Sequence, residues 1–396
     1  MFSSRLKWQS PRNSLSILLE QKRRSGVRVL DLTESNPTRA GFDYPAERIL
    51  TALSDPRSLL YEPDPRGLES AREAVSAYYA QRGVDVSPDR ILLTASTSEA
   101  YAYLFKLLAD PGGEVLVPRP SYPLFEYLAA LESVNVRQYP LRYDGAWHIA
   151  FPALKAAITP HSRAIVVVNP NNPTGSFLKR QELERLEELA LAHDLAILSD
   201  EVFADYFFAE DDDRVPTLAG PRRALTFSMS GLSKIAGLPQ MKLGWIVVSG
   251  PQGRTAPEKA PQTAPQTVME RLELIADTCL SVATPVQWAL PKLLEAGDSV
   301  RAQIVDRTHA NLGQLRAALD GTSAGVLNVE GGWYAVLQVP RTKTEEEWAL
   351  ELLGQQDVLV QPGFFYDFES EAFLVVSLLT APDGFAEGVR RLCAVL

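Results

Sequence analysis

Short apolar runs alternate with stretches of helical periodicity from about residue 90 onward, and this alternation constrains the fold more than any other feature. Strands that alternate with helices form strand–helix–strand units, which pack into a mostly parallel sheet with helices on both faces. The chain is therefore expected to be α/β and doubly wound. Strands are predicted at 91–93, 115–117, 164–168, 195–198, 225–229 and 245–248, and helices at 98–108, 124–131 and 179–192.

The length of 396 residues exceeds what one ordinary hydrophobic core supports, so two domains are predicted. Residues 45–290 are expected to form a large domain, and residues 1–44 together with 291–396 a second, smaller α/β domain. Residues 251–267 are rich in proline and poor in apolar side chains, which favours a surface loop.

Charge and cysteine content narrow the partners and surroundings that suit this chain. A formal net charge of -10 repels phosphate backbones, so nucleic acid is not an expected partner. Cys279 and Cys393 lie far apart and outside any C-x-x-C pattern, which argues against a disulfide framework or a cysteine metal site. This cysteine usage suits the reducing cytoplasm. No apolar run approaches the roughly 18 residues of a membrane span, and the N-terminus lacks the apolar region of a secretory signal.

Polar residues follow five of the predicted strands at the point where each strand ends. Because open parallel sheets bind ligands outside the carboxyl ends of their strands, five such stretches indicate a single site. They are TASTSE (94–99), PRPSYP (118–123), NPNNPTG (169–175), SDE (199–201) and the turn that contains Lys234.

Lys234 stands between two predicted strands, within the stretch TFSMSGLSKIAGLPQMKLGWIVV (226–248). The small residues Ser230, Gly231 and Ser233 leave its amine unobstructed. Burial between two strands would remove water from the amine, lower its pKa and favour the neutral nucleophile that Schiff-base chemistry requires. A solvated surface turn is the alternative, and this stretch alone does not decide between the two.

The other polar residues also have structural interpretations. Ser96 and Glu99 match a capping box, although hydroxyls and free N–H groups at a helix N-terminus also bind phosphate. Tyr122 could belong to the core, Asn172 to a turn and Asp200 to a helix cap. Both kinds of interpretation stay open on these residues alone.

In their order and spacing, NPNNPTG (169–175), SDEVF (199–203) and the serine-rich turn with Lys234 resemble the class I/II aminotransferases, which have the pyridoxal-phosphate fold called type I. The resemblance runs from about residue 31 to the C-terminus and includes two motifs that look like those of the family's small domain. They are EGGWYAV (330–336) and VLVQPGFFY (358–366). It implies a doubly wound, mostly parallel sheet in a large cofactor-binding domain, with a smaller α/β domain beside it.

The resemblance implies pyridoxal 5′-phosphate as the cofactor and gives each polar residue a role. Lys234 matches the lysine that forms a Schiff base with the cofactor and then carries the proton. Asp200 matches the carboxylate that keeps the pyridine nitrogen protonated, so that the ring can accept the carbanion electrons. Asn172 matches the amide that binds the ring hydroxyl, and Tyr122 the aromatic that stacks on the ring. The residues that match the phosphate cradle are Ser96, Thr97 and Ser98.

Two further matches concern the phosphate. Lys242 stands where many members have an arginine, and it can pair with phosphate as a point charge without the bidentate fork. Tyr61, in YEPDPRG (61–67), resembles the tyrosine that reaches the phosphate of the partner subunit, although its spacing to Gly67 is one residue longer. The resemblance therefore implies a homodimer with shared active sites.

Two departures from the family's pattern affect the choice of substrate. Phe203 stands where a tyrosine usually bonds the ring oxygen. Val375 stands where an arginine usually clamps the substrate carboxylate. Asn36 and Arg39, in SNPTRAGF (35–42), are predicted at the substrate. Arg39, three residues after Asn36, is the first candidate for a replacement cation there, and a solvated loop arginine is its alternative. Arg119 is a weaker candidate.

The function implied is a pyridoxal-phosphate-dependent aminotransferase that moves an amino group between an amino acid, or a related amine, and a 2-oxo acid by a ping-pong route. A lyase, decarboxylase or racemase of the same fold is an alternative, because these enzymes share the electron sink and the lysine. A binding scaffold without activity is a third interpretation. The presence of Lys234, Asp200 and Asn172 together favours an enzyme.

Overall fold

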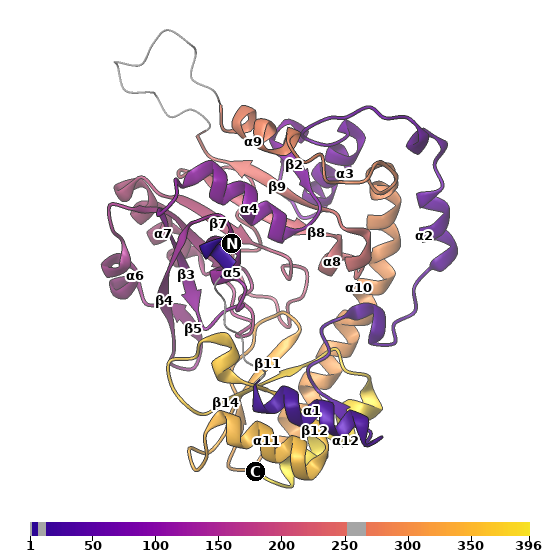
Figure 1. Ribbon diagram of the computed structural model, residues 1–396, viewed down its shortest axis with the longest axis vertical. Coiled ribbons are helices and arrows are strands. Elements are labelled where there is room, and N and C mark those ends of the chain that lie inside the picture. The colour runs from indigo at the N-terminus through magenta and orange to yellow at the C-terminus, as the bar shows by residue number, and fades with distance from the viewer. Residues whose placement is uncertain (1, 7–12, 252–266) are drawn as a thin grey trace.

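The computed structural model describes residues 2–6, 13–251 and 267–396, and its centre is an eight-stranded sheet (Figure 1). The strands lie in the order β2 (Ile91–Thr94), β9 (Gly244–Ser249), β8 (Thr226–Gly231), β7 (Ala196–Asp200), β6 (Ser162–Val168), β3 (Glu114–Arg119), β4 (Asn135–Tyr143) and β5 (Trp147–Ile149). The pairs from β8 through β4 are parallel. β9 is antiparallel to both β8 and β2, so β2 runs in the same direction as the parallel strands.

The six predicted strands are confirmed, each displaced by no more than three residues at either end. The strands β4 and β5 were not predicted. β4 has exposed residues at both ends and carries Arg137, Gln138 and Arg142, which interrupt the apolar run expected of a central strand. It lies toward the edge of the sheet, where only part of a strand is buried, so its sequence lacks the signal of the inner strands.

Helices cover both faces of the sheet, as the alternating pattern predicts. Successive strand residues point to opposite faces, so Ala164 and Val166 pack on one side while Ile165 and Val167 pack on the other. The first face is covered by α4 (Thr97–Leu108), α5 (Phe125–Leu131) and α9 (Val268–Asp277). The second is covered by α6 (Phe151–Ala157), α7 (Arg180–His193), α2 (Ala46–Leu53), α3 (Glu69–Ala80) and the short α8 (Leu232–Ile235).

A second region joins the N-terminal segment from residue 14 onward to the C-terminal part of the chain (Figure 1). Residues 4–6, predicted to belong to it, lie instead against α5 of the large region, where the Arg5 side chain donates to the Leu131 carbonyl at 3.1 Å. Its antiparallel sheet has the order β10 (Gly325–Val326), β11 (Tyr334–Gln338), β14 (Phe373–Ser377) and β13 (Gln361–Pro362). β1 (Leu30–Asp31) pairs in parallel with β12 (Val358–Leu359), which ties the N-terminal segment to the C-terminal one. A separate apolar core forms between these strands and the helices α1 (Ser14–Arg24), α11 (Glu345–Gln356) and α12 (Pro382–Cys393).

The 36-residue helix α10 (Thr284–Leu319) connects the two regions. Its first half packs into the core beneath β2 and β9, and its second half into the core of the C-terminal region. The boundary predicted between residues 290 and 291 falls inside this helix, so it does not mark a break in the chain. An unbroken apolar stripe runs through that point, and composition shows no linker there.

Short 3-10 helices complete the fold. Two further predictions concern the loop at 251–267 and the lack of a membrane-spanning helix. These helices are η1 (Ser4–Leu6), η2 (Pro37–Arg39), η3 (Pro56–Leu59), η4 (Pro88–Arg90), η5 (Pro239–Met241) and η6 (Gly363–Tyr366). The loop predicted at 251–267 lies, apart from its two end residues, outside the described residues. Across the described ranges, every helix is too short or too polar to cross a membrane.

Gly297 lets α10 approach the turn that follows α8. A Cβ at Gly297 would overlap the Ala236 side chain and lie 2.8 Å from the Ala236 Cα, so we expect Gly297→Ala to reduce the free energy of unfolding by about 1–3 kcal/mol. Gly313 is the control, because it is exposed in the same helix and a Cβ added there would meet no atom within 4 Å. Gly313→Ala should instead stabilise by roughly 0.5–1 kcal/mol. Urea unfolding compares the two, and equal effects would contradict the packing argument.

Candidate active site

A cavity of about 170 Å³ lies at the carboxyl ends of the parallel strands. All five polar stretches singled out in the sequence contribute to its wall. They supply Ser96, Thr97 and Ser98 after β2, Tyr122 after β3, Asn172 after β6, Asp200 at the end of β7 and Lys234 after β8. The other side is closed by Ser35, which follows β1, and by Tyr334 of β11. The cavity therefore lies between the large sheet and the region formed by the two chain ends.

Lys234 is buried in α8 with aromatic rings around its amine. Its Nζ lies 4.7 Å from the ring centroid of Trp333 and 5.5 Å from that of Phe203. Burial lowers the pKa of Lys234 to about 8, and the charge of Asp200 opposes this shift only in part. A substantial fraction of the amine is therefore neutral near physiological pH, as a nucleophile or a general base requires.

Asp200 is a buried carboxyl group with few hydrogen-bond donors. The Tyr101 hydroxyl donates to it at 3.2 Å and the Val202 N–H at 3.3 Å. Burial raises the pKa of Asp200 to about 6, and the Val202 N–H, Tyr101 and the charge of Lys234 offset part of that rise. Such a group is strongly stabilised by a cationic N–H placed against it, because that partner repays the desolvation of the carboxylate.

Asn172 supplies an independent sign that the cavity is built for a polar ligand. Its Oδ1 is buried and finds no hydrogen-bond partner among the described residues. Buried side-chain amides in native proteins are normally bonded, so an orphaned one on a cavity wall indicates a partner that binds there. Either amide atom can face that partner, because the two ends of the group differ only in assignment.

The phosphate end of the predicted site combines a helix N-terminus with close backbone packing. The Ser96 Oγ accepts a hydrogen bond from the Glu99 N–H at 3.2 Å, so the structural interpretation as a cap is correct for this atom. Ser96 nevertheless lines the cavity with Thr97 and Ser98 at the start of α4, a position that favours an anion. Gly231 and Gly244 pair across β8 and β9 there, and a Cβ on Gly231 would lie 2.8 Å from the Gly244 Cα.

The two departures from the family's pattern are both buried. Phe203 packs edge-to-face against Trp333, with ring centroids 5.2 Å apart. The hydroxyl of Tyr206, three residues after Phe203, donates to the Lys234 carbonyl at 2.6 Å and so does not replace the hydroxyl of a tyrosine at 203. Val375 is 1% exposed and belongs to the apolar core, where it pairs with Val336 across the sheet.

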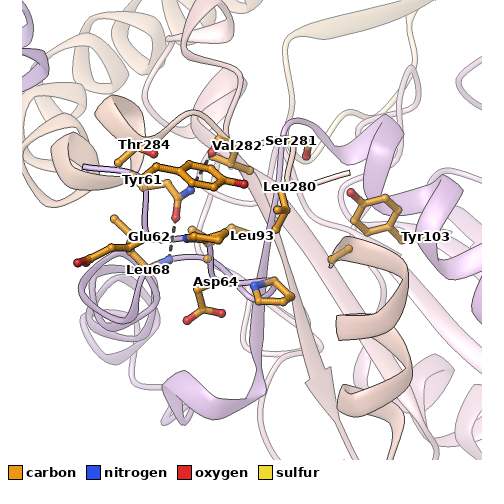
Figure 2. Close-up of a pocket in the computed structure, with 15 residues that line it drawn as sticks. Tyr61, Glu62, Asp64, Leu68, Leu93, Tyr103, Leu280, Ser281, Val282 and Thr284 are labelled. Atoms are coloured by element: carbon orange, nitrogen blue, oxygen red, sulfur yellow. Dashed lines mark hydrogen bonds between the residues drawn. The ribbon is translucent and has the colours of Figure 1, made fainter. Parts of the chain in front are cut away.

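Four predicted residues do not line this cavity in the single chain. Lys242 is exposed and directly precedes Leu243 and Gly244, which do line it. Tyr61 is 78% exposed and lies in a second cavity, with Leu93, Tyr103 and Ser281 among its other lining residues (Figure 2).

Asn36 and Arg39, the two residues predicted at the substrate, also do not line the cavity. The Asn36 side chain caps η2 by accepting from the Thr38 N–H at 3.0 Å. Arg39 is exposed and stands outside the cavity wall, next to the cap that Asn36 forms. Arg119, the weaker candidate, is engaged in an ion pair with Glu369.

Four residues near Lys234 and Asp200 were not singled out from the sequence. Tyr101 holds Asp200, Trp333 covers the Lys234 amine, and Ser35 and Tyr334 line the cavity from the C-terminal side. Tyr101 lies one helical turn after Thr97, so the α4 periodicity could have placed it on the same face. Trp333 and Tyr334 belong to EGGWYAV (330–336), but only tertiary packing brings that motif to the lysine.

Comparison with known proteins agrees with this geometry. The chain matches the family "Aminotransferase class I and II" over residues 27–392. It is 31% identical to the glutamate-pyruvate aminotransferase AlaA of Escherichia coli (strain K12), covering 93% of this chain and 91% of that protein. It is 27% identical to an aspartate/prephenate aminotransferase of Thermus thermophilus, covering 94% and 92%.

Solved structures show the same fold. An aminotransferase from Escherichia coli superposes with a TM-score of 0.83 at 25% identity, covering 100% of this chain and 97% of that one. An alanine aminotransferase from Pyrococcus furiosus gives a TM-score of 0.84 at 23% identity, covering 100% and 99%, which bears on the fold alone.

The fold and the cavity define a pyridoxal-phosphate enzyme of fold type I. The chain belongs to the class I and II aminotransferases. Enzymes of this family use pyridoxal 5′-phosphate to exchange an amino group between amino acids and 2-oxo acids by a ping-pong mechanism. The orphaned amide, the desolvated lysine and acid, and the helix N-terminus all fit that cofactor.

Replacing Asp200 by asparagine should stabilise the cofactor-free protein at neutral pH. The folded-state pKa of about 6 lies above the ordinary 3.8, so stability is lost as pH rises through this window. At pH 8 the ionised group costs about 3 kcal/mol, a cost that Asp200→Asn removes. Urea unfolding at pH 4 and pH 8 measures the difference. An Asp200→Asn protein with the same advantage at both pH values would contradict the prediction.

Proposed function

We propose that Lys234 is the residue to which the cofactor attaches and that the other residues predicted from the sequence hold it. Asp200 would face the ring nitrogen, the Asn172 amide the ring hydroxyl, and Tyr122 the face of the ring. The phosphate would be held by Ser96, Thr97 and Ser98, with Lys242 as a nearby cation. The observation that carries this proposal is that side chains from five strands line one cavity, with a desolvated lysine beside a buried acid.

The bound cofactor supplies an electron sink for the bond broken at the substrate Cα. Lys234 would take the proton from that carbon and return it at the other end of the transfer, since a pKa of about 8 suits a base that works near neutral pH. Asp200 would keep a proton on the ring nitrogen by offering it a buried carboxylate. Phe203 and Trp333 are buried beside the amine, which limits access of water to it.

An amino acid is the donor and a 2-oxo acid the acceptor in this proposal. Glutamate and pyruvate are the first pair to test, because a relative that is 31% identical is named for them. The cytoplasm is the proposed location. Support for it comes from Cys279 and Cys393, which are both free thiols.

Substitution of Lys234 provides the test of the function. The wild-type holoenzyme should convert between its two cofactor forms, seen by absorbance, when an amino acid and then a 2-oxo acid is added. Borohydride reduction and peptide mapping should label Lys234. Lys234→Ala should remove the label and slow the half-reaction by at least about 100-fold, because general-base catalysis is lost. Lys106→Ala is the control, since Lys106 is an exposed lysine paired with Glu132. A label elsewhere, or unchanged kinetics in Lys234→Ala, would refute the assignment.

We also propose a homodimer, on the basis of large apolar side chains exposed within residues 50–61. Leu59 is 89% exposed, and Leu50, Leu60 and Tyr61 are exposed as well. Several large apolar side chains exposed within one short segment are unusual on a monomer and suit an interface. In such a dimer Tyr61 would reach the cofactor phosphate of the partner subunit. The exposed ring beside the second cavity suits that role (Figure 2).

Charge placed on this segment should break the dimer. The double variant Leu59→Glu, Leu60→Glu would bury two unpaired carboxylates in the interface, so we expect it to elute as a 43.6 kDa monomer while the wild type elutes at twice that mass. Leu191→Glu alters a leucine that is also exposed, on α7, and should leave the dimer intact. Light scattering after gel filtration gives the masses. A double variant that stays dimeric would place the interface elsewhere.

A further inference from the structure

The cavity around Lys234 contains little positive charge with which to hold a substrate carboxylate. Among the described residues that line it, Lys234 is the one cation and Asp200 the one anion. Both the amino acid and the 2-oxo acid carry a carboxylate next to the reacting carbon. A carboxylate that enters a partly dry cavity must be hydrogen-bonded there, or the cost of its desolvation is not offset.

The position where an arginine is usual, and the two arginines considered as its replacement, are all unsuited to this task. Val375 is apolar and buried in the core, Arg39 is exposed outside the wall, and Arg119 is paired with Glu369. The cavity offers neutral hydroxyls instead. Apart from Ser233 and the three residues assigned to the phosphate, these are Ser35 and Tyr122, which lie in loops, and Tyr334 of β11. Tyr122 is already assigned to the face of the cofactor ring.

Tyr334 is the hydroxyl best suited to bind an anion. It is 8% exposed, belongs to the rigid strand β11 and directly follows Trp333, which covers the Lys234 amine. Burial raises the pKa of Tyr334, as do the charges of Tyr122 and Glu34, while a hydrogen bond with Ser35 lowers it in part. The phenol therefore stays protonated across the physiological range and can always donate.

Ser35 completes the pair, and Glu34 sets its electrostatic surroundings. Ser35 and Tyr334 both line the cavity from the side of the C-terminal region, so both hydroxyls belong to the same part of its wall. The Glu34 carboxylate would repel a bound anion, and its Oε1 accepts the Asn36 N–H at 2.7 Å, a hydrogen bond that offsets part of this repulsion. This loop is held in turn by the Ser377 hydroxyl, which donates to the Glu34 carbonyl.

We propose that Tyr334 and Ser35 form a neutral hydrogen-bonding subsite for the substrate carboxylate, in place of a cation. The inference rests on the proposed function, because it concerns the substrate of that same site. Hydroxyl donors give a weaker and less charge-selective hold than a guanidinium. The enzyme should therefore accept amines that lack the carboxylate more readily than a site with a paired arginine would.

The experiment compares substrates that differ only in the carboxylate. The rate constant of the half-reaction is measured on the holoenzyme, by cofactor absorbance, with L-alanine and with ethylamine. If another amino acid is the donor, it is paired with its own decarboxylated amine. Tyr334→Phe should slow the amino acid reaction by about 10–100-fold, as expected for one lost hydrogen bond to a charged group, and should change the amine reaction by less than about 3-fold. Calorimetric titration with propanoate should show the same selective loss of affinity.

Two further variants make the result specific. Tyr366→Phe removes the hydroxyl of another buried tyrosine of the C-terminal region, one that bonds Gln361 outside this cavity, and should leave both rate constants unchanged. Arg39→Ala tests the rival cation. A selective loss in Arg39→Ala, with none in Tyr334→Phe, would overturn the proposal, as would equal losses on both substrates in Tyr334→Phe. If the wild type reacts with no amino acid, the proposed function fails, and the propanoate titration still decides whether Tyr334 binds a carboxylate.

Discussion

The structure depends on one electrostatic arrangement, the pair Lys234 and Asp200. The desolvation of each group is offset only in part by its hydrogen bonds or by the charge of the other. Burial lowers the pKa of Lys234 to about 8 and raises that of Asp200 to about 6, so each group is held away from its ordinary ionisation. A parallel sheet makes this possible, because β7 and β8 are adjacent and both end at the cavity. The sheet thereby brings both groups to one cavity, where each is only partly exposed.

The C-terminal region contributes the cover over that pair, and glycines fix its position. A Cβ on Gly331 would overlap the Tyr206 carbonyl, so only glycine fits where this loop crosses the strand ends. The Gly332 N–H donates to the same carbonyl at 2.7 Å, and Lys179 bonds Glu330 at 3.0 Å. These contacts hold the loop that carries Trp333 and Tyr334, so the cover over Lys234 is anchored by backbone bonds as well as by side-chain packing.

Much of the fold and the lysine–acid end of the site could be predicted from the sequence, because both depend on order along the chain. Strands that alternate with helices dictate a parallel sheet, and a parallel sheet brings Asn172, Asp200 and Lys234 to one edge. The substrate end could not be predicted in the same way. Tyr334 lies about 100 residues along the chain from Lys234 and reaches the cavity only because the two regions pack together. The motif SNPTRAGF (35–42) suggested Arg39 instead. The 290/291 boundary falls inside α10, whose packing leaves no mark in composition, so the predicted division into two domains stays a prediction.

Three features of the cavity are costly in the protein alone, and a single ligand would relieve all of them. Asp200 is desolvated, Lys234 is held partly neutral, and the Asn172 Oδ1 has no partner among the described residues. A cofactor with a cationic ring nitrogen, a reactive carbonyl and a ring hydroxyl offers one complementary group to each. The cofactor would therefore bind more tightly, because it offsets the desolvation of Asp200 and Lys234 and pairs the Asn172 Oδ1 in addition to making new contacts. Because a ligand that binds only the folded state stabilises that state by mass action, the fold and the cofactor site are thermodynamically linked through these three residues.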